Sequence, residues 1–360
     1  MKTKLLKAGF LATIVAMSLV ACSSDDDTTE GAIEEEGVIE EGGEMVEESE
    51  IEIDDTTDLF ELSGFIEGNV TINVVEQTLS NGEVADVYEI TASNSTSIPV
   101  EHDMGPWCPT SVDQNDDTDG GIWLDNGVLY QVTGDFLVDL PNFYDDSTWN
   151  LIEEDGVTIK YIDTREGCEL AARPDVDPEF QNHCVQCLPE WFEDDDLTAT
   201  YYIPVNPVKL ETSTIPNGER GIALNGVVFD GPAPVADILS AYTIAAFDNA
   251  GGHVNPFVGY HYHTATGMST KIDQEDDHTG MIGYALDGFG IYEYTADANG
   301  DDLDLADLDD CRGHEDDVRG YHYHISAPGI NEHIPCFSGA IVQGDDEGQG
   351  GPGGPGGPPM

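Results

Sequence analysis

Basic residues are scarce in this chain of 360 residues, which has 11 Lys and Arg against 73 Asp and Glu and a formal net charge of −62. A surface this negative repels phosphate backbones and anionic headgroups, so we expect no nucleic-acid partner. The charge suits cation binding, or a solvated acidic surface that keeps a protein soluble in salty water. We favour the solvated surface over a store of many ions.

Long hydrophobic runs are also missing. The apolar segment near the N-terminus, residues 9–20, is too short for a stable membrane span. It follows Lys2, Lys4 and Lys7 and ends at Leu19-Val20-Ala21-Cys22. This ending resembles the lipobox of bacterial lipoproteins. The resemblance implies a signal peptide over residues 1–21, acylation of Cys22 and an anchor in the outer membrane of the cell envelope. The alternatives are an ordinary secretory signal and a cytosolic helix with a chance Cys.

Cysteine is limited to seven residues, and six remain if Cys22 carries a lipid. An even number in an exported protein favours disulfides over free thiols. Cys184 and Cys187 have the Cys-x-x-Cys spacing of zinc and redox sites, but no second such pair accompanies them. We therefore prefer disulfides, with zinc as the alternative. The candidates are Cys108, Cys168, Cys184, Cys187, Cys311 and Cys336, and only the pair Cys311 with Cys336 is singled out, by its place around a repeated motif.

The chain ends differ in composition from its middle. Residues 22–58 are acidic, with no Lys or Arg, and the first aromatic residue after them is Phe60. Such a segment buries too little apolar surface to offset its ordering entropy, so we predict a disordered tether. Residues 343–360 form a Gly/Pro-rich tail, which we also predict to be disordered. The folded part is then residues 59–342.

Short β-branched and aromatic segments predict the fold class of this middle part. They lie at residues 69–75, 87–91, 121–124, 128–132, 157–161 and 199–203, and each is bounded by Gly, Asn, Asp or Pro. Asn81-Gly82 is a hairpin signal between the first two. No window before residue 230 has a long helical periodicity, and residues 235–246 are one helix candidate. We predict a single, mainly β domain with few short helices, supported by disulfides.

The string Gly-Tyr-His-Tyr-His occurs twice, at residues 259–263 and 320–324. It ends a longer duplication, since residues 221–226 resemble residues 283–288, and Gly252-His253 resembles Gly313-His314. The duplicated units are thus about 221–263 and 283–324. Two copies are too few for a solenoid. They suit two lobes related by a pseudo-twofold axis. The duplicated histidines then form a three-histidine cluster in each repeat or one composite cluster across the repeats, and we favour convergence near the axis.

The repeated histidines have the spacing of metal ligands. Alternate side chains of a strand share a face, so the two histidines of each string can reach one ion. Nitrogen donors favour zinc or copper(II) over calcium. Each Asp of the repeat is a further oxygen ligand, or an acceptor that fixes an imidazole tautomer. The candidates are His253, His261, His263, His314, His322, His324, Asp248 and Asp309. Buried, hydrogen-bonded struts are the alternative role of these histidines.

Other chemical motifs are few. Asp297, Asn299 and Asp301 place oxygen donors at alternate positions, as calcium loops do, and residues 113–120 have a similar pattern. Neither completes an EF-hand, so calcium is a second cofactor candidate only. The chain has no phosphate loop, dinucleotide fingerprint, nucleophile elbow or His-Glu-x-x-His motif.

Taken together, residues 221–227, 252–263, 283–289 and 320–324 resemble the bacterial YHYH domain family. Residues 98–103 are similar to an early segment of such proteins, and residues 336–339 to their closing element. The resemblance therefore spans roughly residues 65–345, and it adds His102 to the metal candidates. It implies an exported bacterial setting but no particular reaction.

Three functions follow from these observations. The preferred one is a lipid-anchored cell-envelope protein whose YHYH domain binds metal. The second is a metal-dependent extracellular enzyme, hydrolytic or oxidative. The third is a structural or adhesive surface protein without metal. No sequence feature points to a particular protein or polysaccharide partner.

Overall fold

The computed structural model of the protein describes residues 70–93, 100–192, 197–276, 278–294 and 307–344. All of them belong to the compact unit Asp54–Met360. The predicted signal peptide, Cys22, the tether, most of the tail and the candidate calcium residues Asp297, Asn299 and Asp301 lie outside the described residues.

A three-stranded antiparallel sheet opens the described part, in the order β1-β2-β6. Its strands are β1 (Val70–Thr78), β2 (Val84–Ser93) and β6 (Thr198–Pro204). The predicted hairpin is confirmed: Gly82 has φ +87, and the Asn81 side chain accepts a hydrogen bond from the Glu83 N–H at 3.0 Å. A left-handed residue in the turn is what Gly tolerates without strain.

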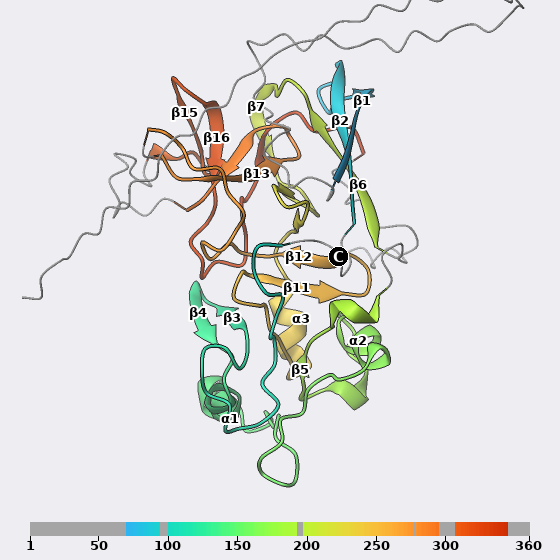
Figure 1. Ribbon diagram of the computed structural model, residues 1–360, viewed down its shortest axis with the longest axis vertical. Coiled ribbons are helices and arrows are strands. Elements are labelled where there is room, and N and C mark those ends of the chain that lie inside the picture. The colour runs from blue at the N-terminus through green and yellow to red at the C-terminus, as the bar shows by residue number, and fades with distance from the viewer. Residues whose placement is uncertain (1–69, 94–99, 193–196, 277, 295–306, 345–360) are drawn as a thin grey trace, which may run out of the picture. The chain divides into compact units, whose positions relative to one another are not determined.

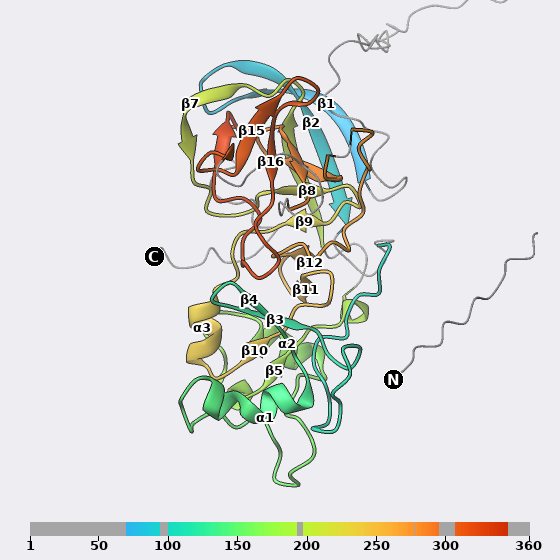
Figure 2. The same cartoon turned by 90° about the vertical axis from the view of Figure 1, so that its left-hand side faces the viewer.

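The central element is an eight-stranded sheet in the order β11-β12-β9-β8-β13-β14-β16-β15. Figures 1 and 2 show its last strands in orange and red. The strand bounds are β8 Gly221–Ala223, β9 Val228–Phe229, β11 Gly252–Asn255, β12 Gly259–Tyr262, β13 Met281–Ala285, β14 Gly290–Tyr292, β15 Gly313–Asp316 and β16 Gly320–His324.

The order of this sheet shows the duplication in space. The strands β8, β9, β12 and β11 of the first unit are matched by β13, β14, β16 and β15 of the second. The two halves meet where β8 pairs with β13, and there Ile222 lies opposite Tyr284, its own counterpart 62 residues later. Gly221 pairs with Ala285 and Ala223 with Gly283 in the same way. The predicted pseudo-twofold axis thus passes through the middle of the sheet.

Smaller elements complete the fold. They are α1 (Gly134–Phe143), α2 (Arg165–Ala171), α3 (Val235–Ser240), two 3-10 turns (Pro178–Phe180 and Pro189–Trp191), and the two-stranded pairs β3 (Ile122–Asp125) with β4 (Val128–Gln131), β5 (Cys184–Val185) with β10 (Ile244–Ala245), and β7 (Lys209–Thr214) with β17 (Phe337–Gly339). Both views draw α1, α2, α3 and β5 together, on the far side of β11 and β12 from β1 and β2 (Figures 1 and 2). The mainly β prediction is confirmed.

Three local predictions need correction. Residues 157–161 form no strand, because they make only isolated bridges to separate segments such as Ser111 and Ile152. The helix predicted over residues 235–246 ends at Ser240, since Tyr242 takes φ +58, and the chain then enters β10. Helices α1 and α2 were not predicted. They are short, and each begins at a threonine cap, Thr133 or Thr164, whose side chain accepts from a backbone N–H three residues on.

Three disulfides link the described cysteines, as predicted from their even number. The expected pair Cys311–Cys336 is confirmed. Cys184 and Cys187 bond to different partners, Cys108 and Cys168, so neither is left as a thiolate for zinc. The first bond joins the segment before β3 to β5, and the second joins α2 to the chain two residues after β5.

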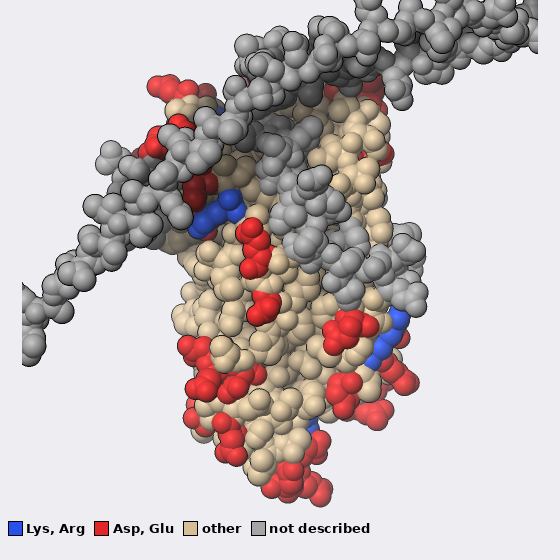
Figure 3. Space-filling model, viewed as in Figure 1, with Lys and Arg blue, Asp and Glu red and all other residues tan. Residues whose placement is uncertain are grey.

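The surface keeps the acidic character of the sequence. On the face drawn in Figure 3, Asp and Glu side chains are spread over the described part, and Lys and Arg are few. Within the part of the chain that the structure describes, no helix has the length and apolar character needed to cross a membrane.

Candidate metal centres

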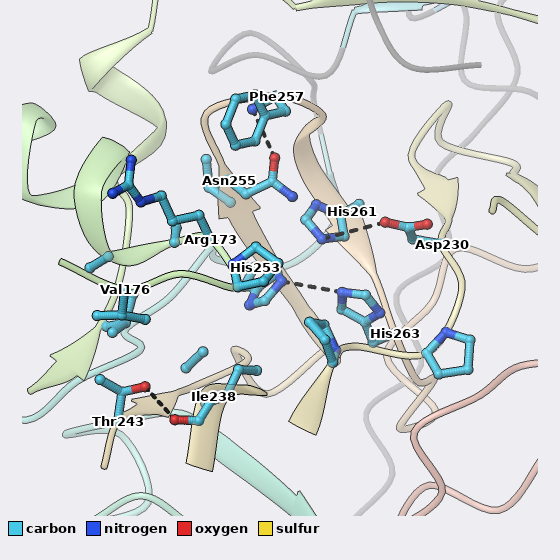
Figure 4. A pocket seen from close by; sticks show the side chains of 18 of the residues that line it. Arg173, Val176, Asp230, Ile238, Thr243, His253, Asn255, Phe257, His261 and His263 are labelled. Carbon is cyan, nitrogen blue, oxygen red and sulfur yellow. Dashed lines mark hydrogen bonds and ion pairs between the residues drawn. The ribbon is translucent and has the colours of Figure 1, made fainter. Parts of the chain in front are cut away.

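The first histidine group lies on β11 and β12. His253 of β11 pairs with His261 of β12, and His263 follows at the end of β12. The alternation predicted for this strand is confirmed, because His261 and His263 line one cavity while the Tyr262 hydroxyl, on the other face, accepts from the Asn225 side chain at 2.9 Å. Figure 4 shows the three rings beside one another at this cavity. We call His253, His261 and His263 the first site.

Backbone carbonyls determine the tautomers of this site. The His261 Nδ1 lies 2.8 Å from the Gly259 carbonyl oxygen, and the His263 Nδ1 lies 2.6 Å from that of Gly231. A carbonyl only accepts, so each Nδ1 carries the proton and donates. In a neutral ring the Nε2 then has a free lone pair. The His263 Nε2 faces the His253 Nε2 at 3.2 Å.

The second histidine group lies on β15, β16 and the segment before β13. It has four members, and we call these the second site: His278, His314, His322 and His324. The His278 and His322 Nε2 atoms are 3.1 Å apart, and so are those of His314 and His324.

Carbonyls fix three rings of the second site in the same way. The Nδ1 atoms of His278, His322 and His324 face the carbonyl oxygens of Thr279, Gly320 and Glu293 at 2.9, 2.9 and 3.1 Å. Gly320 and Glu293 are the counterparts of Gly259 and Gly231, so the duplication preserved the acceptors as well as the rings. Three Nε2 lone pairs therefore point toward one another.

The spacing of these nitrogens matches that of ligands around one ion. Within each site, one ligand atom from every residue lies within 4.8 Å of all the others. Two nitrogens held about 2.0–2.1 Å from a tetrahedral zinc ion are about 3.3 Å apart. Among the described residues, these are the only two groups of three or more His, Cys, Asp or Glu that meet this condition.

Burial keeps these imidazoles neutral. It lowers the pKa of His263 and of His324 to about 3, and neighbouring imidazoles add to the effect. It lowers the pKa of His322 to about 4, and it holds the pKa of His253 well below the ordinary value. A metal binds the neutral ring, so these four histidines are in the ligating form at neutral pH.

Asp248 and Asp309 hold tyrosines and turns rather than histidines, which corrects their prediction as metal ligands. The Tyr260 hydroxyl donates to Asp248 at 2.7 Å, and the Tyr321 hydroxyl donates to Asp309 at 2.7 Å. The other oxygen of each carboxylate accepts two backbone N–H groups, at Gly252 or Gly313 and at the residue two before it. Neither carboxylate belongs to a histidine group.

His102 also lies apart from both sites. Its Nε2 is 2.9 Å from the Tyr260 hydroxyl, so it contacts the opposite face of the strand from His261 and His263. Burial lowers its pKa. His102 extends the tyrosine–aspartate network of the first unit, and its prediction as a metal ligand is corrected accordingly.

The duplicated histidines form two sites, not one composite site, which corrects the expected convergence. Strands β12 and β16 are separated in the sheet by β9, β8, β13 and β14. The axis passes between β8 and β13, whereas the histidine strands lie toward the two edges. Position along the sheet therefore keeps the sites apart.

Sequence reasoning missed His278. This residue precedes the second unit and has no histidine counterpart in the first, so the repeat gives no signal for it. Only the fold places it beside His322.

The fold and the sites define a disulfide-linked, mainly β protein with a duplicated sheet and two histidine centres. Residues 200–306 match the family model described as YHYH protein, so a YHYH domain is present in the chain. The match contains the first unit and ends before the second Tyr-His-Tyr-His string, a narrower span than the resemblance predicted. The comparisons with curated proteins and with solved structures gave no match.

Proposed function

We propose that the protein is an exported metal-binding module in which each duplicated unit holds one transition-metal ion. The observation that carries this proposal is the pair His278 and His322. Each ring donates its Nδ1–H to a carbonyl, yet their Nε2 atoms lie 3.1 Å apart. Two lone pairs at that distance repel each other unless a cation lies between them.

The alternative role, a buried and hydrogen-bonded strut, accounts for only one of the two nitrogens of a ring. A structural histidine uses both nitrogens on acceptors or donors of the surrounding protein. Here the Nδ1 atoms of His322 and His324 meet that description, as do those of their counterparts His261 and His263. The Nε2 atoms of His263 and His324 instead face another imidazole, at 3.2 and 3.1 Å. Repetition of this imidazole–imidazole contact in both units supports a ligand-binding role over a strut.

Nitrogen donors alone favour zinc or copper(II). Imidazole suits both ions, whereas calcium takes oxygen ligands. The net charge of −62 attracts any cation toward the protein surface and does not select among them. We therefore assign selectivity to the histidines.

Delivery to the cell envelope is part of the proposal. The lipobox-like ending at Cys22 supports a lipid anchor. The three disulfides suit an oxidising compartment outside the cytosol.

The test is elemental analysis of protein purified without a histidine tag, before and after dialysis against zinc or copper. We expect two ions per chain. The pair His261→Ala/His263→Ala should remove one, and His322→Ala/His324→Ala should remove the other. His183→Ala is the matched control, because His183 belongs to neither site. Absence of metal in the purified protein, together with no uptake on titration, would falsify the proposal.

A further inference from the structure

The two sites differ in the number of their ligands. The second has four imidazoles and the first has three. The residues 61 and 62 positions before His278 are Asn217 and Pro216, so the first unit has no imidazole at the matching place. Four nitrogens complete a tetrahedral shell, whereas three leave one position for a molecule from outside the protein.

A second difference lies on the neighbouring strand. Position 292 is Tyr in the second unit, and its ring packs against His278 and His322 with centroids 4.8 Å apart in each case. The counterpart in the first unit is Asp230, whose Oδ2 lies 3.8 Å from the His261 Nε2. At this position the second unit has an aromatic cover and the first has a carboxylate. The carboxylate near the second site comes instead from β15, where the Asp316 Oδ2 lies 4.0 Å from the His322 Nε2.

A cavity lies beside the first site, at the positions where the two units differ. Its volume is about 280 Å³, and the three histidines, Asp230 and Asn217 line it. Figure 4 shows Val176 and Ile238 across the cavity from the histidines, and Asp230 beside His261. Much of the remaining wall is apolar, including Val185, Pro234 and Phe257. Pockets for small molecules have this character, a mostly apolar wall with a few polar groups, at volumes of roughly 300–1,000 Å³.

We propose that the first site is an open metal centre that takes a small, uncharged hydroxyl compound with an apolar body, while the second site is closed and structural. The hydroxyl oxygen occupies the fourth metal position, its hydrogen is donated to Asp230, and the apolar body lies along Val176 and Ile238. Asp230 beside that position accepts a hydrogen bond, so it favours a ligand that can donate one. This inference rests on the proposed metal binding.

The first experiment tests openness with azide, a small ligand that gives a charge-transfer absorption when it binds copper(II). Copper-loaded wild-type protein should show one azide-binding ion out of two. His322→Ala/His324→Ala should keep the azide absorption, and His261→Ala/His263→Ala should lose it. Two bound ions with no azide absorption would overturn this inference and leave the proposed metal binding intact. Failure to take up either copper or zinc would overturn both.

Single substitutions should exchange the properties of the two sites. Asn217→His, at an exposed position that lines the cavity, adds a fourth imidazole and should remove azide binding from the first site. His278→Ala opens the second site and should add an azide-binding ion. Retention of metal is measured in each variant, so a misfolded protein is recognised by loss of the ion. Unchanged azide stoichiometry in both variants, with metal retained, contradicts the assignment of open and closed sites.

The second experiment tests the ligand class with phenol, using competition against azide in the His322→Ala/His324→Ala protein. Asp230→Ala removes the acceptor and should weaken phenol binding about tenfold, the loss expected for one hydrogen bond to a charged group. Anisole has the same ring without the O–H, and it should compete weakly and equally in both proteins. Equal phenol affinity with and without the Asp230 carboxylate rules out the assigned ligand class.

Discussion

Asn225 and Asp287, counterparts in the two units, hold the matching tyrosines with opposite hydrogen-bond directions. The Asn225 amide donates to the Tyr262 hydroxyl, whereas the Tyr323 hydroxyl donates to the Asp287 carboxylate. Both side chains also accept a backbone N–H two residues on. The duplication therefore kept the contact to the tyrosine, although an amide in one unit is a carboxylate in the other. The two units can be compared to find the effect of that carboxylate.

The buried Asp287 predicts a pH-dependent stability. Burial raises the pKa of its carboxyl to about 6, against an unfolded value of about 3.9. As the pH rises from 4 to 7, the unfolded state releases its proton first, so the folded state loses stability relative to it. Over this range the loss attributable to this group is about 2 kcal/mol. We expect metal-free Asp287→Asn protein to lack this component in urea unfolding at pH 4, 5, 6 and 7.

The control for that experiment is Asn225→Asp, which places a carboxyl at the corresponding buried position. It should add a destabilisation that grows over the same pH range. If the difference in unfolding free energy between wild type and Asp287→Asn stays constant from pH 4 to 7, the raised pKa is wrong.

The sequence predicted the repeated elements well because strand alternation and glycine placement are local properties. The shared face of His261 and His263 and the Asn81-Gly82 turn needed no tertiary information. The separation of the two sites did need it, since it depends on β8 pairing with β13. The contribution of His278 depended on the fold for the same reason: its partner His322 lies 44 residues further along the chain.

The turn carboxylates Asp248 and Asp309 should stabilise the hairpins that carry the histidines. Asp248→Ala removes the acceptor for two backbone N–H groups and the Tyr260 hydroxyl, all of them buried. We expect a loss of about 2–4 kcal/mol in unfolding free energy, since each unsatisfied buried group costs about 1–3 kcal/mol. Denaturant unfolding measures it, and the exposed Asp163→Ala serves as a matched control.

The same substitution distinguishes the two units. Metal should be lost from the first site in Asp248→Ala and from the second in Asp309→Ala, with the other ion retained. Simultaneous loss of both ions from either variant would show that the hairpins do not act separately.

The disulfide Cys311–Cys336 should support the second site alone. Cys311 lies in the turn held by Asp309, and the bond ties that turn to the segment before β17 across 25 residues. Loop-closure entropy gives a stabilisation of about 3–4 kcal/mol for a loop of this length. We expect Cys311→Ser/Cys336→Ser to unfold at lower denaturant and to bind the second ion more weakly. Equal weakening of the first ion would contradict a local effect.

Gly252 and Gly313 should not tolerate a methyl group, because each packs against the hydroxyl of a repeated tyrosine. A Cβ on Gly252 would lie 2.5 Å from the Tyr260 hydroxyl oxygen, and one on Gly313 would lie 2.0 Å from that of Tyr321. Those hydroxyls are held by Asp248 and Asp309, so they cannot move without breaking a buried hydrogen bond. Gly252→Ala should therefore lower the unfolding free energy by about 1–3 kcal/mol, as at other overpacked sites. It should also lower the occupancy of the first site.

Gly267→Ala is the control for adding a methyl group without steric overlap. A Cβ there meets nothing within 4 Å, although its φ of +90 adds backbone strain. If Gly252→Ala retains the first ion with wild-type affinity, the tyrosine network does not position His253.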